Sequence, residues 1–220
     1  MLDLLLPPAC LACRTATRRG EQLCRDCRAA LPWLPAGRCE RCGLPRPCGA
    51  CCPAAKAAFA RSWAPLAYDA TARALVHALK LRGLTSAADL MAAHIAATAP
   101  PELLAEGVLV PVPGNPRRRR TRGFDPAEAI ARALRRRTGL PMRPLLRASG
   151  RGAAQAGAGR RQRLRRREIA VVAGRRVVPE RVVLVDDVHT TGATLDACAR
   201  ALRAAGSPMI VAVIYARTLE

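Results

Sequence analysis

The stretch RVVLVDDVHTTGAT, Arg181–Thr194, decides which fold this chain can adopt. Val182–Val185 is a short, apolar, β-branched run, typical of a strand that is buried on both faces. Two adjacent carboxylates, Asp186 and Asp187, end this run, and small residues follow over 190–194. Leu195–Ala205 then has the apolar spacing of a helix. The order of strand, acids, small-residue loop and helix predicts a strand-to-helix unit of a parallel sheet.

This unit also has the chemistry of a binding site for a sugar that carries a phosphate. The backbone amides and hydroxyls of the loop can surround a phosphate, and the start of the following helix favours its negative charge. Gly192 lets the backbone approach the ligand closely. An ionised Asp only accepts hydrogen bonds, so Asp186 and Asp187 suit two neighbouring hydroxyl groups. The predicted phosphate loop contains Thr190, Thr191, Gly192, Ala193 and Thr194.

The alternative is an ordinary strand-to-helix turn in which an Asp caps the helix. An isolated Asp pair or an isolated Thr-Thr-Gly would favour that alternative. The complete ordered combination is far more specific, and it favours the sugar-phosphate site.

The composition limits the class of protein. The 220 residues suffice for one α/β domain and a small module, half of them are apolar, and the net charge is +21. Between Val110 and Glu180 there are 20 arginines and four acidic residues, a field that attracts phosphates on a small substrate or along a nucleic acid. No apolar run reaches the ~18 residues that span a bilayer. Met1–Pro8 is too short for a signal peptide, so we expect a cytoplasmic protein without membrane insertion.

Nine of the ten cysteines lie in the first 52 residues, and eight of these form four pairs with the spacing Cys-x2-Cys. Two such pairs complete one tetrahedral zinc site. The alternatives are disulfides, which need an oxidising compartment, and redox-active pairs; four pairs in tandem favour one or two structural zinc ions. In the second set Cys52 is an alternative to Cys51. The predicted ligands are Cys10, Cys13, Cys24 and Cys27 in the first set, and Cys39, Cys42, Cys48 and Cys51 in the second.

The rest of the chain alternates between strand and helix patterns. We therefore expect an α/β fold with a mainly parallel sheet flanked by helices. The predicted domains are a double zinc ribbon at 1–53 and the α/β domain at 54–220. The predicted strands lie at 63–68, 107–113, 169–172, 182–185 and 209–214, and the predicted helices at 71–81, 87–97, 126–136 and 195–205.

Two arginine-rich segments complete the pattern. The segment 117–123 follows a strand that its prolines end, and an Arg-rich loop in that place suits a pyrophosphate. A solvated basic surface loop is the alternative. Gly150–Arg167 combines glycines with many arginines and has no carboxylate. We expect this segment to be flexible. It could close over a bound polyanion, contact a nucleic-acid backbone, or be a disordered basic loop.

Arg181–Thr194 resembles the motif that binds phosphoribosyl pyrophosphate (PRPP) in type I phosphoribosyltransferases. Taken with the paired cysteines, Pro111–Pro113 and Arg122–Phe124, the chain resembles the ComF-type competence family from about Cys10 to its C-terminus. That family joins a double zinc ribbon to a type I phosphoribosyltransferase-like domain. Two further motifs of that family have matches in this chain. Its helix-end lysine motif matches Leu79-Lys80 and Gly83, and its Gln-and-Arg loop matches Gln155, Arg160, Arg163 and Leu164.

The resemblance implies a role for each matched residue. Asp186 and Asp187 would hold the ribose hydroxyls, and the loop from His189 to Thr194 would hold the 5′-phosphate, with Mg²⁺ accompanying PRPP. Lys80 and Arg122 would be catalytic. Gly123, Gln155, Arg160 and Arg163 would form the pyrophosphate side and its basic loop.

The resemblance also implies two kinds of function. One is transfer of a ribose phosphate from PRPP to an acceptor that the sequence leaves open, because Thr190 stands where purine-salvage members often carry an Asp. The other is a non-catalytic module that binds single-stranded DNA or senses PRPP. Family members are implicated in natural transformation and DNA uptake, so single-stranded DNA and competence-machinery proteins are the expected partners.

Overall fold

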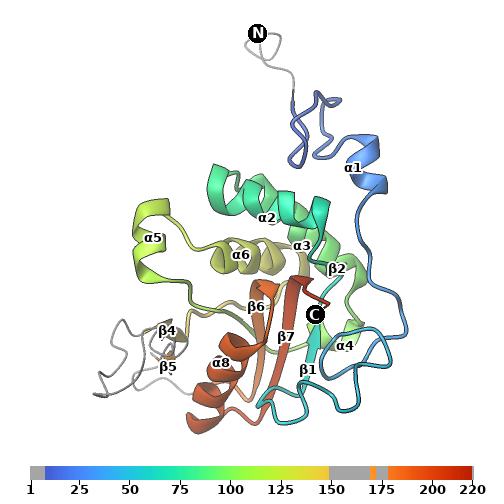
Figure 1. Ribbon diagram of the computed structural model, residues 1–220. Coiled ribbons are helices and arrows are strands. Elements are labelled where there is room, and N and C mark those ends of the chain that lie inside the picture. Colours follow the sequence, from blue (N-terminus) through green and yellow to red (C-terminus); the bar gives the residue numbers. More distant parts are fainter. Residues whose placement is uncertain (1–7, 149–168, 172–177, 220) are drawn as a thin grey trace, which may run out of the picture.

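A parallel sheet forms the centre of the molecule (Figure 1). The computed structural model describes residues 8–148, 169–171 and 178–219. β6 (Arg181–His189) and β7 (Met209–Arg217) are the longest strands and pair with each other. β3 (Val108–Pro111) pairs with β6, and both β1 (Arg61–Trp63) and β2 (Leu66–Ala67) pair with β7, all in parallel. The predicted α/β fold with a mainly parallel sheet is therefore confirmed.

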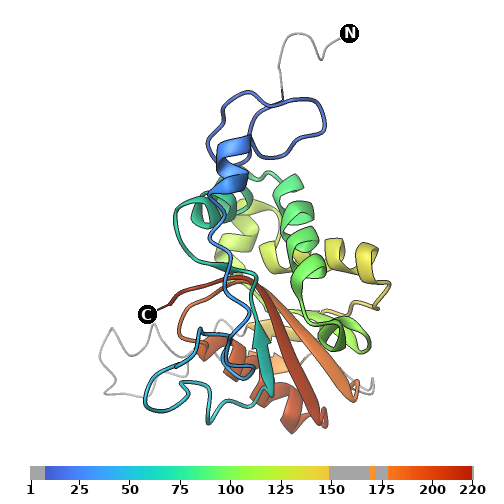
Figure 2. The ribbon, with the colours of Figure 1, turned by 90° about the vertical axis from the view of Figure 1, so that its right-hand side faces the viewer.

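Helices cover both faces of this sheet (Figure 2). One face carries α2 (Ala70–Arg82), α3 (Ser86–Thr98) and α6 (Pro126–Thr138), whereas α8 (Ala193–Ala204) covers the other. The shorter helices are α1 (Arg25–Ala29), α4 (Pro101–Leu104) and α5 (Pro116–Arg122). β4 (Leu146–Ala148) and β5 (Ile169–Val171) form a separate antiparallel pair.

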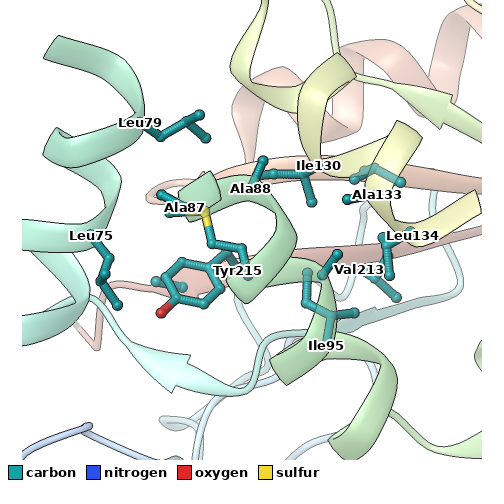
Figure 3. Packing of buried hydrophobic residues seen from close by; sticks show 14 of the residues in the cluster. Leu75, Leu79, Ala87, Ala88, Ile95, Ile130, Ala133, Leu134, Val213 and Tyr215 are labelled. Carbon is teal, nitrogen blue, oxygen red and sulfur yellow. The ribbon is translucent and has the colours of Figure 1, made fainter. Parts of the chain in front are cut away.

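Successive side chains of the central strands point to opposite faces, as the pleat requires. Val213 and Tyr215 of β7 pack with α2, α3 and α6 (Figure 3), whereas Ala212 and Ile214 pack with α8. The ring of Tyr215 is fully buried, and its hydroxyl finds no partner within the described ranges. Burial raises the pKa of this hydroxyl.

The four predicted helices agree with α2, α3, α6 and α8 to within two residues at each end. The single strand predicted at 63–68 is wrong, because Pro65 has no backbone N–H and separates β1 from β2. The strand predicted at 182–185 extends to His189, because β7 continues to pair with β6 beyond the two acids.

Two expectations about the basic half of the chain are also corrected. The Arg-rich segment after β3 is not a loop but the helix α5. Asn115 caps this helix by accepting a hydrogen bond from the Arg117 amide, and Pro116 occupies its first position. The strand at Ile169 lies outside the main sheet, because it pairs with β4. A short apolar run shows that a strand is present but does not identify its partner.

Candidate functional site

The carboxyl end of β6 extends beyond the end of its neighbouring strand β3. β3 pairs with β6 only as far as Pro111, opposite Val185, and the chain then turns away after Val112. Within the described residues, no strand therefore pairs on that side with Asp186 and Asp187, the next two residues of β6. Open parallel sheets bind ligands at this place, outside the carboxyl ends of their strands.

A cavity of about 170 Å³ lies at this end of β6. Its charged lining side chains are Lys80, Arg118, Arg119, Arg122, Asp125, Asp186 and Asp187, and Thr194 also lines it. Five residues that the sequence predicted for the site therefore meet in one cavity, although they come from α2, α5, β6 and α8. Those five are Lys80, Arg122, Asp186, Asp187 and Thr194.

The two acids point to different faces of the sheet and have different partners. Asp187 Oδ1 lies 2.5 Å from Lys80 Nζ, in the last turn of α2. Burial raises the pKa of Asp187, and Lys80 opposes this rise. Burial and the neighbouring carboxylate of Asp187 raise the pKa of Asp186. Such a pair gains from a bound group that donates hydrogen bonds or carries positive charge.

Positive charge reaches the cavity from α5. Residues 118, 119 and 122 lie on one face of this helix, since they are spaced three and four apart. Arg122 acts on Asp187 by lowering its pKa. The sequence analysis did not predict Arg118 and Arg119 as site residues. Only the three- and four-residue spacing from Arg122 along a helix would have distinguished them from Arg117 and Arg120.

Asp125 fixes the loop that borders the cavity. It is 7 % exposed, and its carboxylate accepts hydrogen bonds from the Gly114 amide at 2.8 Å and from the Ala127 amide at 3.1 Å. A Cβ at Gly114 would lie 2.6 Å from Asp125 Oδ2, so a larger residue there would displace this hydrogen-bonded carboxylate. In the sequence, an Asp directly before Pro126 at the start of a predicted helix is the pattern that indicates such a capping residue.

The predicted phosphate loop lies between two cavities. Thr194 lines the first cavity, whereas Thr191, Gly192 and Ala193 line a second one that also contains Phe59 and Arg217. Thr190 is exposed and lines neither cavity.

Other predicted site residues have different places. His189 is not part of the loop, because it is the last residue of β6 and only 3 % exposed. Gly123 ends α5 in the left-handed conformation and does not line the first cavity. Gln155, Arg160 and Arg163 lie outside the described residues.

The cysteines form two groups with the geometry of tetrahedral metal sites. The sulfur atoms in each group lie within 4.8 Å of one another. Cys13 and Cys24 are 3.6 Å apart at Sγ, and Cys39 and Cys52 are 3.8 Å apart. Four thiolates at normal Zn–S distances around one Zn²⁺ are separated by ~3.8 Å, so both groups fit zinc.

Residues 1–56 match the model of the double zinc ribbon domain. These residues are a double zinc ribbon. The first zinc group of the ribbon contains Cys10, Cys13, Cys24 and Cys27, and the second zinc group contains Cys39, Cys42, Cys48 and Cys52. No curated protein matches the chain. Among the helices of the described ranges, none has the length and apolarity that crossing a membrane needs.

The fourth ligand of the second zinc group corrects the prediction of Cys51. Gly49 has a φ of +100°, and the turn around it leaves the Cys51 side chain exposed. Cys52 lies in the group instead. The spacing from Cys48 allows either Cys51 or Cys52 to be the fourth ligand, so the conformation of the turn decides between them.

The two zinc groups of the ribbon pack on opposite faces of the sheet. Leu11 and Leu23, beside the first zinc group, belong to the core that contains α2 and α3, and Gln22 Nε2 donates to the Ser86 carbonyl at 3.1 Å. Cys42 of the second zinc group belongs to the core that contains α8. Just after the ribbon, the Ala58 amide donates to Asp196 Oδ1 on α8 at 2.8 Å.

Proposed function

We propose that this protein binds PRPP, or a related 5-phosphoribosyl compound, together with Mg²⁺ at the carboxyl end of β6. We further propose that it is a phosphoribosyltransferase-like protein of the ComF type that acts in DNA uptake. One observation carries the proposal: the two acids, Lys80 and three arginines of α5 line one cavity at the start of α8.

The chemical demands of PRPP match this cavity group by group. The ribose hydroxyls can donate to the acceptor oxygens of Asp186 and Asp187. The amides at the start of α8 suit the 5′-phosphate, and Arg118, Arg119 and Arg122 suit the pyrophosphate. Mg²⁺ binds oxygen ligands, and it would neutralise charge on the pyrophosphate when bound.

In the transfer that we propose, the acceptor attacks the anomeric carbon of the ribose. The bond from this carbon to the pyrophosphate oxygen breaks, and the pyrophosphate leaves with the electron pair. Arg122 would stabilise the charge that develops on the leaving group. Lys80 would hold Asp187 in place through their ion pair.

Calorimetric titration with PRPP and Mg²⁺ tests the binding step. The double variant Asp186→Asn/Asp187→Asn should lower the affinity about 100-fold, because it removes two charge-assisted hydrogen bonds. Asp89→Asn is the matched control, since Asp89 is an exposed acid on α3 that pairs with Arg136. Binding that is equal in the double variant and the wild type would contradict the proposal.

A pyrophosphate-release assay across candidate acceptors tests the transfer step. Release above that of Asp186→Ala/Asp187→Ala is expected with the correct acceptor. PRPP binding without release for every acceptor class tried would favour a PRPP sensor over an enzyme.

A second candidate is a non-catalytic module that binds single-stranded DNA. The net charge of +21 and the exposed arginines of α5 favour it. DNA affinity should then fall steeply with salt. Arg117 and Arg120 lie outside the cavity lining, unlike Arg118 and Arg122. Arg117→Gln/Arg120→Gln should therefore weaken DNA binding and preserve PRPP binding, and no DNA binding at low salt would eliminate this candidate.

A further inference from the structure

Arg217 is a buried cation without a carboxylate partner in the part of the chain that the structure describes. It ends β7, is 5 % exposed, and lies with its Nη1 2.6 Å from His189 Nδ1. Its Nε has no hydrogen-bond partner there. A guanidinium removed from water needs a compensating negative charge close by.

The second zinc group lies close enough to supply such a charge. Arg217 contacts the His189 ring, this ring lies 3.3 Å from Ser62 Oγ, and Ser62 Oγ lies 3.3 Å from the carbonyl oxygen of the zinc-group residue Cys42. Burial lowers the pKa of Arg217, and the sulfur groups of Cys42, Cys52, Cys39 and Cys48 oppose this effect. One Zn²⁺ with four thiolates has a net charge of −2. Three other arginines near this group, Arg38, Arg41 and Arg46, donate to backbone carbonyls.

Ser62 on β1 links the second zinc group to His189. Its Oγ lies 3.3 Å from the Cys42 carbonyl oxygen and 3.3 Å from His189 Nδ1. The knuckle of the ribbon also packs tightly on β1, since a Cβ at Gly43 would lie 3.0 Å from the Ser62 carbonyl oxygen. Phe59 meets the His189 ring edge to face at 6.3 Å between centroids.

His189 in turn supports the Thr190–Thr194 loop from below. A Cβ at Gly192 would lie 2.6 Å from His189 Nε2, so the imidazole fills the space beneath the loop backbone. Thr218, next to Arg217, donates from its amide to the His189 carbonyl at 3.0 Å and from its hydroxyl to the Thr190 carbonyl at 3.4 Å.

We propose that the second zinc centre is the counter-ion of Arg217 and that, through Arg217 and His189, it holds the Thr190–Thr194 loop in its binding conformation. Arg217, His189 and Ser62 are positioning residues in this scheme. The identity of the bound ligand rests on the proposed function, but the link between zinc and loop does not. The first zinc group packs with α2 and α3 and is the internal control.

The electrostatic link is tested by replacing zinc with Co²⁺ in the full chain. Loss of the positive charge in Arg217→Met makes the nearby thiolates richer in electrons. One component of the thiolate-to-cobalt charge-transfer absorption should therefore move to lower energy. Arg217→Lys, which keeps the charge, should restore the position, and Arg132→Met, at an exposed site on α6, should leave it unchanged. An unchanged spectrum in Arg217→Met would overturn the proposal.

The mechanical link is tested by amide hydrogen exchange over residues 190–196 without any ligand. Arg217→Met and Cys52→Ser should each accelerate exchange at least 10-fold there, whereas Cys13→Ser should stay within 2-fold of the wild type. The double variant Arg217→Met/Cys52→Ser should exchange no faster than the faster single variant.

Two outcomes of the exchange measurement would overturn the proposal. One is a wild-type exchange rate in the loop of folded Arg217→Met, and the other is equal acceleration by Cys13→Ser and Cys52→Ser. If Cys52→Ser unfolds globally, the milder Ser62→Ala replaces it, with the same expected direction. PRPP plays no part in either measurement, so these results stand or fall separately from the proposed function.

Discussion

At the scale of single residues, neighbouring positions in this chain have opposite environments. Cys51 is exposed while Cys52 joins the second zinc group, and Asp186 and Asp187 point to opposite faces of one strand yet border one cavity. Residue type alone therefore does not assign a role here. The direction of the side chain does, and it is set by a turn in one case and by the pleat in the other.

The cysteine pair gives a direct test by zinc analysis. The wild type should bind two zinc ions per chain, one for each group. Cys52→Ser should lower this to about one, because a structural site needs four ligands. Cys51→Ser is the matched control and should keep both ions. Loss of one zinc ion in Cys51→Ser, with full content in Cys52→Ser, would show that the ligand assignment is wrong.

His189 gives a test by pH. Burial, with Arg217 contributing, lowers the pKa of His189 from 6.5 to about 3. The unfolded chain therefore binds a proton at a higher pH than the folded chain, and stability is lost as the pH falls below 6.5. Between pH 7.5 and pH 5 the free energy of unfolding should fall by about 2 kcal/mol more in the wild type than in His189→Gln. Urea unfolding measures both slopes, and equal slopes would contradict a neutral buried imidazole.

At the scale of elements, the connection from β6 to α8 combines a paired strand, a tight turn and a helix start. β6 keeps its pairing with β7 up to His189, which fixes the point where the loop begins. Gly192 then adopts a φ of +77° and starts α8. A side chain at residue 192 would therefore strain the backbone of this connection and press on His189.

Gly192→Ala should destabilise the protein through two effects. The left-handed backbone costs about 1 kcal/mol for a non-glycine residue, and the contact with His189 adds about 1–2 kcal/mol. Gly139→Ala is the matched control, since Gly139 has a φ of +75° and nothing within 4 Å of its added Cβ. Thermal or urea unfolding compares the two variants. Equal losses of unfolding free energy would show that the His189 side chain moves aside without an energetic penalty.

At the scale of the whole molecule, the ribbon is part of the core and not an appendage. Leu23 and Leu31 are buried in the cluster that holds α2 and α3, and Phe59, which follows the ribbon, is buried in the cluster that holds α8. Each zinc group thus packs near a different side of the candidate site. The first group packs near α2, which carries Lys80, and the second group packs near the Thr190–Thr194 loop.

This packing predicts that ribbon and sheet unfold together. Leu23→Ala should lower the free energy of unfolding of the whole chain by about 2–4 kcal/mol, because Leu23 is 3 % exposed. Leu81→Ala should change it by less than about 0.5 kcal/mol, because Leu81 is 71 % exposed. Circular dichroism and tryptophan fluorescence should report one coincident transition. A separate early transition that only Leu23→Ala shifts would contradict shared cooperativity.

The sequence predicted the elements whose signals are local. The helices around α2, α3 and α6 follow from apolar spacing and caps, and the zinc ligands follow from repeated Cys-x2-Cys, with Cys51 as the exception. The β6–α8 unit was predicted for the same reason, since its strand, acids and small-residue loop are contiguous.

The sequence by itself determined the fold class, the zinc chemistry and the two acids, because periodicity and ligand spacing are properties of neighbouring residues. Only the tertiary structure decided that Lys80 meets Asp187, that α5 turns Arg118 and Arg119 toward the cavity, and that His189 lies beneath the loop with Arg217. Such contacts join residues up to 107 positions apart, and the packing of helices on a sheet sets them, not any pattern along the chain.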